Sequence, residues 1–265
     1  MGGGEPRAGS AYYDAMASYT CAVPVAELAH DEFWDLENLR QASRLCSWMY
    51  EQFQPFVGGQ VVEVGAGIGT FSERLLADPT VSQLMLIEPA RACVEVLAET
   101  FEKDPRVTVV RETLPDSSAL RERLGEVDFL LCQNVLEHIE QEGPAVRAMA
   151  DALRPGGQLT LLVPAHPRLY GNLDRLYGHH RRYTRERLRR VVDDAGLVLT
   201  DLYSFNLLGV PGWWVNRLRS KPGISRSSLR AYEALLGLWQ PIERRWRPPW
   251  GLSLVAHARK PGEFA

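Results

Sequence analysis

The chain has 265 residues, of which 45% are hydrophobic, and its formal net charge is −3 at pH 7. That length accommodates one large domain with additions and a sizeable core. The near-neutral charge, together with the lack of any nucleic-acid-binding motif in the sequence, argues against DNA or RNA as a partner. No apolar run reaches the roughly 18 residues that a membrane span needs.

The amino-terminal residues and the cysteines bear on location. Residues 1–10, MGGGEPRAGS, are polar and lack the apolar core of a secretion signal. Cys21, Cys46, Cys93 and Cys132 show no paired spacing. We therefore expect a flexible tail and a reduced, cytoplasmic protein.

Charge is distributed unevenly along the chain. Residues 1–150 hold 11 Lys and Arg against 24 Asp and Glu, a net −13, whereas residues 151–265 hold 19 against 9, a net +10. The basic half either receives an anionic small molecule or forms a solvated face that pairs with the acidic half. Composition leaves both interpretations open.

Two helical patterns precede the first strand. One contains Tyr12, Tyr13 and Tyr19, and the other runs through the apolar residues of the segment 33–53. Residues 11–55 are therefore predicted to form helices before the sheet begins.

Residues 61–70, VVEVGAGIGT, form the most informative stretch of the chain. The valines predict a buried strand. Gly65, Gly67 and Gly69 predict a turn whose backbone approaches a ligand closely, because no Cβ intervenes. A helix that begins near Phe71 points its amino end at this turn, which suits the polar part of a nucleotide-like cofactor. A dinucleotide site places its third glycine three positions after the second, whereas the spacing here is two.

The next two strands end in polar residues. The strand Val81–Glu88 ends in a carboxylate that can accept both hydroxyls of a ribose. Pro89 then begins a helix, which is a favoured place for proline. A third strand, Arg106–Arg111, leads into Glu112, Thr113 and Leu114.

Four more strands follow, at Val127–Cys132, Gln158–Val163, Leu197–Phe205 and Leu252–Ala258. Between the second and third of them, Thr184 is predicted to cap a helix that Gly196 ends. Because ligands bind at the carboxyl ends of strands in open α/β sheets, the loop that begins with Pro164, Ala165 and His166 should lie at a site.

Three ordered motifs resemble a known family. Glu63 and the glycines form E-x-G-x-G-x-G, residues 133–139 follow the fourth strand as QNVLEHI, and Leu153–Gly157 has the form L-x-P-G-G. Over residues 60–165 the chain resembles class I S-adenosylmethionine-dependent methyltransferases of the ubiquinone- and menaquinone-biosynthesis type. The resemblance implies an α/β, Rossmann-like, doubly wound sheet of seven strands, mostly parallel with the last strand antiparallel.

The resemblance also divides the chain. Residues 11–55 would be a helical lid, residues 56–205 and 251–260 the methyltransferase core, and residues 206–250 a helical cap inserted before the last strand. This insertion holds five of the seven tryptophans. Three interpretations of it stay open: a cap over the acceptor pocket, a hairpin packed on the domain, or a surface that touches a membrane.

The implied cofactor is S-adenosyl-L-methionine, with S-adenosyl-L-homocysteine as product. Glu63 is expected near the methionine amino group, Glu88 on the ribose, and Arg40 on the carboxylate as a bidentate pair. Glu112 or Thr113 is expected beside the adenine. The expected cofactor residues are Tyr19, Arg40, Glu63, Gly65, Ala66, Gly67, Gly69, Glu88, Pro89, Thr113, Leu114, Asn134 and Val135.

A catalytic base is needed only if the acceptor must lose a proton. His138, His166 and Tyr183 are the candidates, the histidines first because histidine titrates near neutral pH. Some relatives bind a divalent ion through E-x-x-E-H after the fourth strand, but Asn134 replaces the first acid here. His166 or His179 could complete such a site, yet no metal is expected. The residues expected to bind the acceptor are Tyr170, His179, Arg181, Arg182, Trp213 and Trp214.

The expected function is methyl transfer to oxygen, nitrogen or carbon of a small molecule, such as a natural product or a lipid-like intermediate. The tryptophans of the insertion suggest an acceptor with apolar bulk, and the basic half suggests negative charge. One alternative is a nicotinamide-dependent oxidoreductase, which the glycine spacing disfavours. The other is a non-catalytic protein that binds S-adenosylmethionine, which the intact Glu63, glycines and Glu88 disfavour. The oligomeric state is not predicted.

Overall fold

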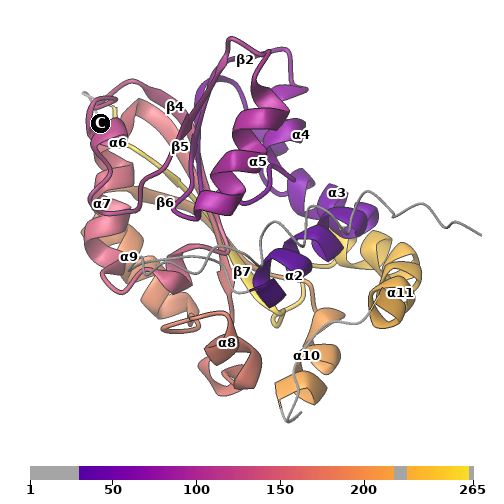
Figure 1. Ribbon diagram of the computed structural model, residues 1–265. Helices are drawn as coiled ribbons and strands as arrows, with labels where there is room; N and C mark the ends of the chain where they lie inside the picture. The colour runs from indigo at the N-terminus through magenta and orange to yellow at the C-terminus, as the bar shows by residue number, and fades with distance from the viewer. Residues whose placement is uncertain (1–29, 218–225, 263–265) are drawn as a thin grey trace, which may run out of the picture.

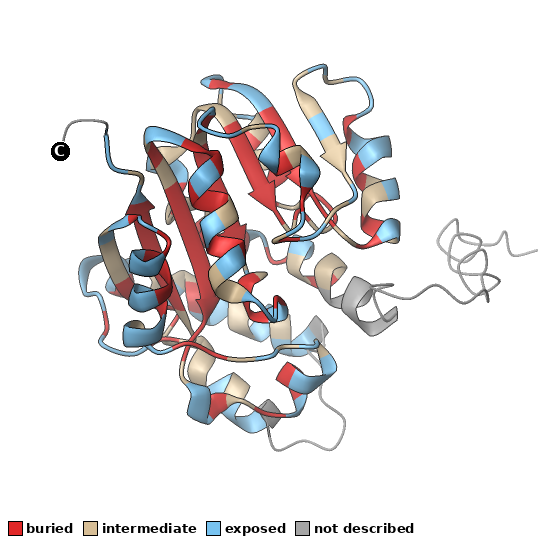
Figure 2. Ribbon diagram, turned by 90° about the vertical axis from the view of Figure 1, so that its left-hand side faces the viewer, coloured by how far each residue is buried: buried red, intermediate tan, exposed pale blue. Residues whose placement is uncertain are grey.

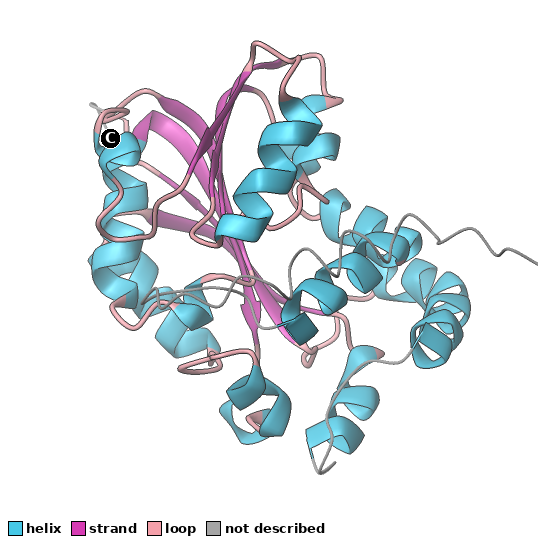
Figure 3. Cartoon of the chain, in the orientation of Figure 1, coloured by secondary structure: helices cyan, strands magenta, loops and turns pink. Residues whose placement is uncertain are grey.

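A seven-stranded sheet organises the protein in a computed structural model, which describes residues 30–217 and 226–262 (Figures 1 and 3). The strand order is β3-β2-β1-β4-β5-β7-β6, and β7 runs antiparallel to both of its neighbours. The expected sheet is thus confirmed. The strands are β1 (Gly59–Val64), β2 (Val81–Ile87), β3 (Val107–Val110), β4 (Val127–Gln133), β5 (Leu153–Pro164), β6 (Val198–Phe205) and β7 (Ser253–Arg259).

Strand β1 lies at the centre of the sheet, and this position explains why its sequence is apolar on both faces. Val62 pairs with Met85 of β2 on one side and with Leu130 of β4 on the other. A parallel strand covered by helices on both faces reads as a continuous apolar run. The chain moves outward through β2 and β3, and then returns to the other side of β1 with β4. In open α/β sheets, ligands bind where the strand order reverses in this way, which here is at the carboxyl ends of β1 and β4.

Helices cover both faces of the sheet, so the buried strands lie between two cores (Figure 2). One core joins the sheet to α7 (Glu142–Ala152) and α9 (Arg185–Asp194) through residues such as Met149 and Val192. The other joins it to α3, α4 and α5 through Trp48, Leu75 and Leu97. The helices of the second core are α3 (Ser43–Glu51), α4 (Ser72–Leu76) and α5 (Arg91–Phe101).

Helices from the two ends of the sequence meet beside the second core. α11 (Arg226–Arg245) packs on α3, and α10 (Gly209–Arg217) packs on α8 (Asn172–Leu176) (Figure 1). The carboxylate of Glu233 in α11 accepts the backbone N–H groups of Arg44 and Leu45, at 3.0 and 2.8 Å. It therefore caps the first turn of α3 from across the chain. α2 (His30–Gln41) precedes α3.

The helix predicted between Thr184 and Gly196 is present as α9, with the expected residues at its two ends. The Thr184 hydroxyl accepts the Arg187 N–H at 3.2 Å and caps α9, while Gly196 follows its end with φ 78°. The fifth strand was expected to begin at Gln158, but β5 begins at Leu153 and includes the L-x-P-G-G segment. The segment forms an irregularity in the strand pairing, because Val127 pairs with Leu153 and Phe129 with Gln158. No helix in the described ranges is long and apolar enough to cross a bilayer.

Candidate cofactor and acceptor site

The glycine turn joins the carboxyl end of β1 to α4, and its three glycines have different reasons to be there. All three have positive φ, at 74°, 55° and 84° for Gly65, Gly67 and Gly69. A Cβ on Gly65 would lie 2.1 Å from Cγ2 of Val135, so this glycine lets the loops after β1 and β4 touch. A Cβ on Gly69 would press on Leu97 of α5 at 3.1 Å. Two of the three glycines are thus required by packing.

Gly67 differs from the other two because little lies above it. The nearest side-chain atoms to a Cβ at this position belong to Leu36 of α2, at an ordinary contact distance of 3.6 Å. Leu36 packs on a small apolar cluster formed by Ile68, Ala90 and Cys93. α2 therefore lies over the turn, and Gly67 is the position where the backbone can meet a ligand.

Glu88 follows β2 and binds this open part of the turn. Its Oε2 accepts the Gly67 N–H and its Oε1 accepts the Ala90 N–H, both at 2.9 Å. The carboxyl is almost fully buried, and burial raises its pKa above the ordinary value although the two N–H groups lower it. A buried acid at the tip of the second strand, bound to the glycine turn, is the arrangement that a ribose diol requires.

Glu63 also contacts the turn, from inside β1. Its Oε2 accepts the Ser72 hydroxyl at 2.6 Å, which ties the strand to the first residue of α4. Burial raises the pKa of Glu63 to about 8, and the nearby Glu88 carboxylate adds to the shift. A cationic group placed beside Glu63 would favour its ionised form.

The loops after β3 and β4 carry most of the remaining residues that are expected to bind the cofactor. Thr113 is exposed and Leu114 is buried, whereas Glu112 accepts the Ser117 and Ser118 hydroxyls, at 2.6 and 2.5 Å, at the start of α6 (Ser118–Arg121). Glu112 is therefore held by a helix end, and Thr113 is the freer of the two adenine candidates. The other residues expected around the cofactor differ in exposure. Ala66 is buried, Pro89 and Val135 are half-buried, and Asn134 is exposed with φ 52°.

The loop after β5 places His166 at the same edge of the sheet. His166 has φ 60°, and its ring stacks on Trp250 with the centroids 5.1 Å apart. Its Nε2 is buried and finds no hydrogen-bond partner among the described residues. Loss of hydration lowers its pKa, which a backbone hydrogen bond from the ring to Gly251 partly offsets. The imidazole is thus poised to be neutral, with a nitrogen available.

Asp174 organises the rest of this loop from a fully buried position. Its Oδ1 accepts Nε of Arg182 at 2.7 Å and lies 2.9 Å from Nδ1 of His179, while its Oδ2 accepts the Gly171 N–H at 2.9 Å. The guanidinium of Arg182 further donates to the Ala165 carbonyl at 3.1 Å. One buried carboxylate therefore holds an arginine and a histidine in fixed orientations.

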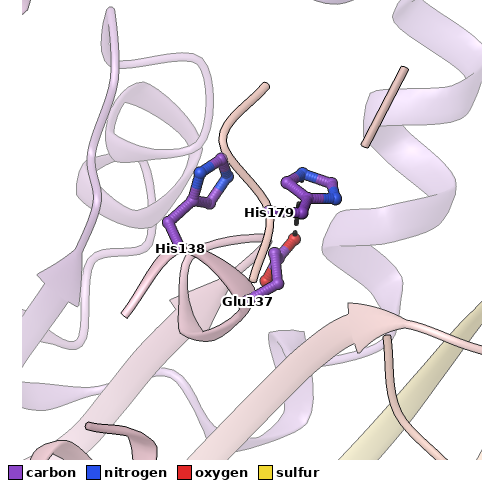
Figure 4. A group of neighbouring side chains, drawn as sticks. All are labelled: Glu137, His138 and His179. Carbon is purple, nitrogen blue, oxygen red and sulfur yellow. Dashed lines mark ion pairs between the residues drawn. The ribbon is translucent and has the colours of Figure 1, made fainter. Parts of the chain in front are cut away.

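Glu137, His138 and His179 meet beside this network (Figure 4). Glu137 and His138 lie in a 3-10 turn directly after β4, and His179 comes from the loop after α8. Nε2 of His179 is 4.0 Å from Oε1 of Glu137, and the two imidazole rings meet edge-on with centroids 4.6 Å apart. Burial raises the pKa of Glu137 to about 8. The three side chains are the group among the described residues that could hold a metal ion.

Comparison with known proteins agrees with this geometry. A family model described as a methyltransferase domain matches residues 37–202, which is more than half of the chain. The chain belongs to the methyltransferase-domain family. The ubiquinone biosynthesis O-methyltransferase of Escherichia coli O157:H7 is 29% identical over 140 residues, covering 50% of this chain and 56% of that protein. The chain thus spans little more than half the length of the curated relatives it matches.

Solved structures share the methyltransferase-domain fold at low identity. The N-methyltransferase NodS from Bradyrhizobium japonicum WM9, in complex with S-adenosyl-L-homocysteine, has a TM-score of 0.54 at 17% identity, with 88% of this chain and 93% of that chain covered. The [4+2]-cyclase SpnF has a TM-score of 0.55 at 17% identity, with 96% and 93% covered. The fold therefore also occurs in a protein named for a different reaction.

Several residues expected at the site of this methyltransferase-domain protein are held elsewhere. Arg181 donates to the carbonyls of Ile139 and Glu140, both at 2.8 Å, and pairs with Glu142. Together with the bonds of Arg182 to Asp174 and Ala165, this corrects the expectation that the two arginines bind the acceptor. Each guanidinium is thus held by at least two groups of the protein itself.

Tyr183 is a second correction. It is fully buried, its hydroxyl donates to the Leu136 carbonyl at 3.3 Å, and burial raises its pKa far above the ordinary value. A phenol so placed cannot act as a base toward a substrate. Tyr170 likewise uses its hydroxyl internally, donating to the His179 carbonyl at 2.7 Å.

The remaining candidates differ in their exposure and in whether they already bind a group of the protein. Arg40 forms an exposed ion pair with Glu73 at 2.5 Å, which a cofactor carboxylate would have to displace. Trp213 lies under the Arg182 guanidinium, with its Nε1 buried and unpartnered within the described part of the chain, and Trp214 is half exposed. Tyr19 lies outside the described residues.

Two polar side chains escaped sequence reasoning. Asp174 sits within a short helix and carries no motif, so only the tertiary structure shows that it holds Arg182 and His179. Gln133, the last residue of β4, has a buried Oε1 without a partner in the described ranges. Its place at the end of a strand was the signal that could have identified it.

Proposed function

We propose that the protein transfers a methyl group from S-adenosyl-L-methionine to a small molecule bound at the carboxyl edge of the sheet. The observation that carries this proposal is the pairing of buried Glu88 with the N–H of Gly67, the one glycine of the turn where a Cβ would meet no contact closer than 3.6 Å. Membership of the methyltransferase-domain family supports the same cofactor.

The residues present fit the cofactor. Glu88 would accept the ribose hydroxyls, Glu63 would face the amino group, and Thr113 and Leu114 would flank the adenine. When bound, S-adenosylmethionine supplies a methyl group on a positively charged sulfur. The chain's task is then to align the acceptor with that methyl group and to exclude water. For an acceptor that must lose a proton, the buried Nε2 of His166 is available to receive it.

The acceptor we propose has apolar bulk. His166 stacks on Trp250. Trp213 of α10 lies beside the 3-10 turn that follows His166, and its buried indole N–H has no hydrogen-bond partner among the residues that the structure describes. Buried polar atoms that lack hydrogen-bond partners at this edge of the sheet suit a ligand that offers those partners. Arg181 and Arg182 add no support for a negative charge on the acceptor, because they bind groups of the protein itself. Three described cysteines are free and buried, which favours a cytoplasmic location.

Binding and turnover test the proposal separately. Calorimetry of the full chain should show one site for S-adenosylmethionine and for S-adenosylhomocysteine, and none for nicotinamide nucleotides. Incubation with acceptor mixtures should then yield products heavier by one methyl group in mass spectrometry. Preference for a nicotinamide nucleotide would establish the oxidoreductase alternative. Binding of S-adenosylmethionine with no methylated product from any acceptor class would favour the non-catalytic alternative, or a different reaction on this fold.

A further inference from the structure

We propose that Glu137, His138 and His179 form a binding site for a divalent transition-metal ion, which would hold an oxygen atom of the acceptor. Each side chain offers one ligand atom, and these atoms all lie within 4.8 Å of one another (Figure 4). Only the role toward the acceptor rests on the proposed function. Binding of the ion does not depend on it.

Both imidazoles are oriented as metal ligands usually are. A metal-binding histidine commonly donates its outer N–H to a carboxylate or a backbone carbonyl, which fixes the tautomer and leaves the other nitrogen for the ion. His179 has Asp174 in this position, with Nδ1 to Oδ1 at 2.9 Å. The imidazole ring of His138 forms a hydrogen bond with the backbone of Tyr177. Two histidines from separate loops thus have matching outer partners.

Glu137 gives an independent reason to place a cation here. Its side chain is only 1% exposed, and its Oε2 finds no hydrogen-bond donor among the described residues. A buried carboxylate oxygen without a donor is costly, and a metal ion would satisfy it. The unpartnered group belongs to the same cluster as the two oriented imidazoles.

The donor set indicates the kind of ion. Two imidazole nitrogens and one carboxylate oxygen suit zinc, manganese, iron or cobalt, whereas magnesium prefers oxygen ligands and retained water. Bonds of about 2.0–2.2 Å require the ligand atoms to approach one another by roughly 1 Å from the present spacing. Three protein ligands leave coordination positions open for water and for an acceptor oxygen.

The site lies where an acceptor must bind. The 3-10 turn that carries Glu137 and His138 follows Val135, whose side chain packs on Gly65 of the cofactor turn. The sequence motif alone predicted no metal, because Asn134 replaces the first acid. His179 is 41 positions after His138 in the chain, and the fold of the loop after β5 brings it to the cluster.

Metal binding can be measured without any acceptor or cofactor. Chelator-treated full-length protein should bind one zinc or cobalt ion per chain in calorimetry, cobalt should give a visible absorption spectrum, and magnesium should bind far more weakly. His179→Gln and Glu137→Gln should remove the site, and Asp174→Asn should weaken it roughly 10–100-fold. His180→Gln, which replaces an exposed neighbour outside the cluster, should bind as the wild type does.

Two outcomes would overturn this site. Wild-type protein that takes up no zinc, cobalt or manganese ion would do so regardless of how the variants fold. Binding that survives in folded His179→Gln but disappears in His180→Gln would show an adventitious surface site. Because S-adenosylmethionine binding is measured separately, either result would leave the proposed methyltransferase function standing.

We also infer that the outward face of α11 docks on an anionic lipid surface. Leu235, Leu238, Ile242 and Trp246 are exposed at 55%, 76%, 50% and 52%. Their spacing of three and four residues places them on one side of the helix. The opposite side of α11 packs on the domain, with Leu236 fully buried. The helix thus shows an apolar stripe to its surroundings.

The arginines that flank this apolar stripe indicate that its partner is an anionic lipid surface. Both acids of α11 are turned inward: Glu233 caps α3, and buried Glu243 accepts the Asn206 N–H at 2.6 Å. Exposed Arg230 and Arg245 therefore have no acidic side chain of α11 beside them on the outward face. An apolar stripe flanked by arginines suits the interface of an anionic membrane, whereas two copies of such a face would repel.

Vesicle sedimentation of the full chain tests the lipid surface. The protein should sediment with vesicles of phosphatidylcholine and phosphatidylglycerol, and much less with phosphatidylcholine alone. Leu238→Ser combined with Ile242→Ser should reduce binding, whereas Leu124→Ser, at an exposed leucine elsewhere, should not. Equal sedimentation of the α11 variant and the wild type would overturn the inference. So would concentration-dependent dimerisation that the α11 variant abolishes while vesicles are not bound.

Discussion

The guanidinium of Arg182 lies 4.4 Å from the centre of the Trp213 indole ring, while its Nε binds the buried carboxylate of Asp174. This stack joins the loop after β5 to α10, two segments that both contribute to the proposed acceptor site. An arginine that sequence reasoning assigned to an anionic acceptor is thus part of the framework that shapes the pocket.

Replacement of Arg182 should therefore affect folding before it affects the acceptor. Arg182→Gln leaves Asp174 buried without its cationic partner, and loss of one member of a buried pair costs about 3–5 kcal/mol. Urea unfolding should show this loss. Arg189→Gln, on the exposed side of α9, should leave stability within about 0.5 kcal/mol of the wild type. A stable Arg182→Gln with only a raised KM would restore the original assignment.

Gly67→Ala should weaken S-adenosylmethionine binding without a comparable effect on folding. The new Cβ would lie at an ordinary contact distance of 3.6 Å from Leu36, at the place where the cofactor is proposed to meet the backbone. Gly125→Ala is the matched control, because Gly125 also has positive φ, at 73°, with nothing near its Cβ position. Both variants bear a backbone cost of roughly 1–2 kcal/mol in unfolding. Calorimetry that finds equal affinity in both would contradict the placement of the cofactor.

Glu88→Ala should lower S-adenosylmethionine affinity by about 1–3 kcal/mol, the usual cost of losing a hydrogen bond to a charged group. Glu88→Gln keeps one acceptor oxygen and should lose less. Glu112→Ala provides the control, since that carboxylate binds Ser117 and Ser118 at the start of α6. It should change stability and leave affinity unaltered. Unchanged affinity in Glu88→Ala would remove the ribose assignment.

His257 predicts a loss of stability in acid. It is buried in β7 beside Thr160 and Tyr203, and burial lowers its pKa to about 4. Below pH 6.5 the unfolded chain therefore binds a proton that the folded chain does not. The contribution of His257 to the free energy of unfolding should fall by about 3 kcal/mol as the pH drops from 6.5 to 4, and it should be complete above pH 6.5.

His257→Gln should flatten that part of the pH profile, because glutamine does not titrate. Urea unfolding of both proteins between pH 4 and pH 7.5 would measure the difference. An identical slope in the two proteins would assign the acid sensitivity to other groups.

The local order of elements was readable from the sequence. The valines of β1, the glycine turn, the carboxylate at the end of β2 and the Thr184 cap each act over a few residues, so their patterns predict structure directly. Parallel strands buried on both faces need apolar runs, and those runs showed where the strands lie. The seven-stranded sheet with its antiparallel last strand followed from the family resemblance and was confirmed.

Tertiary structure alone decided which partners the polar side chains bind. Arg181, Arg182 and Tyr183 follow β5 as expected, yet they bind carbonyls, a buried acid and the core, because a buried polar group must find its partner wherever the fold supplies one. His179 joins Glu137 and His138 across 41 residues for the same reason, since Asp174 orients its ring. Sequence patterns record the periodicity of strands and helices, whereas hydrogen-bond partners between distant loops depend on how those elements pack.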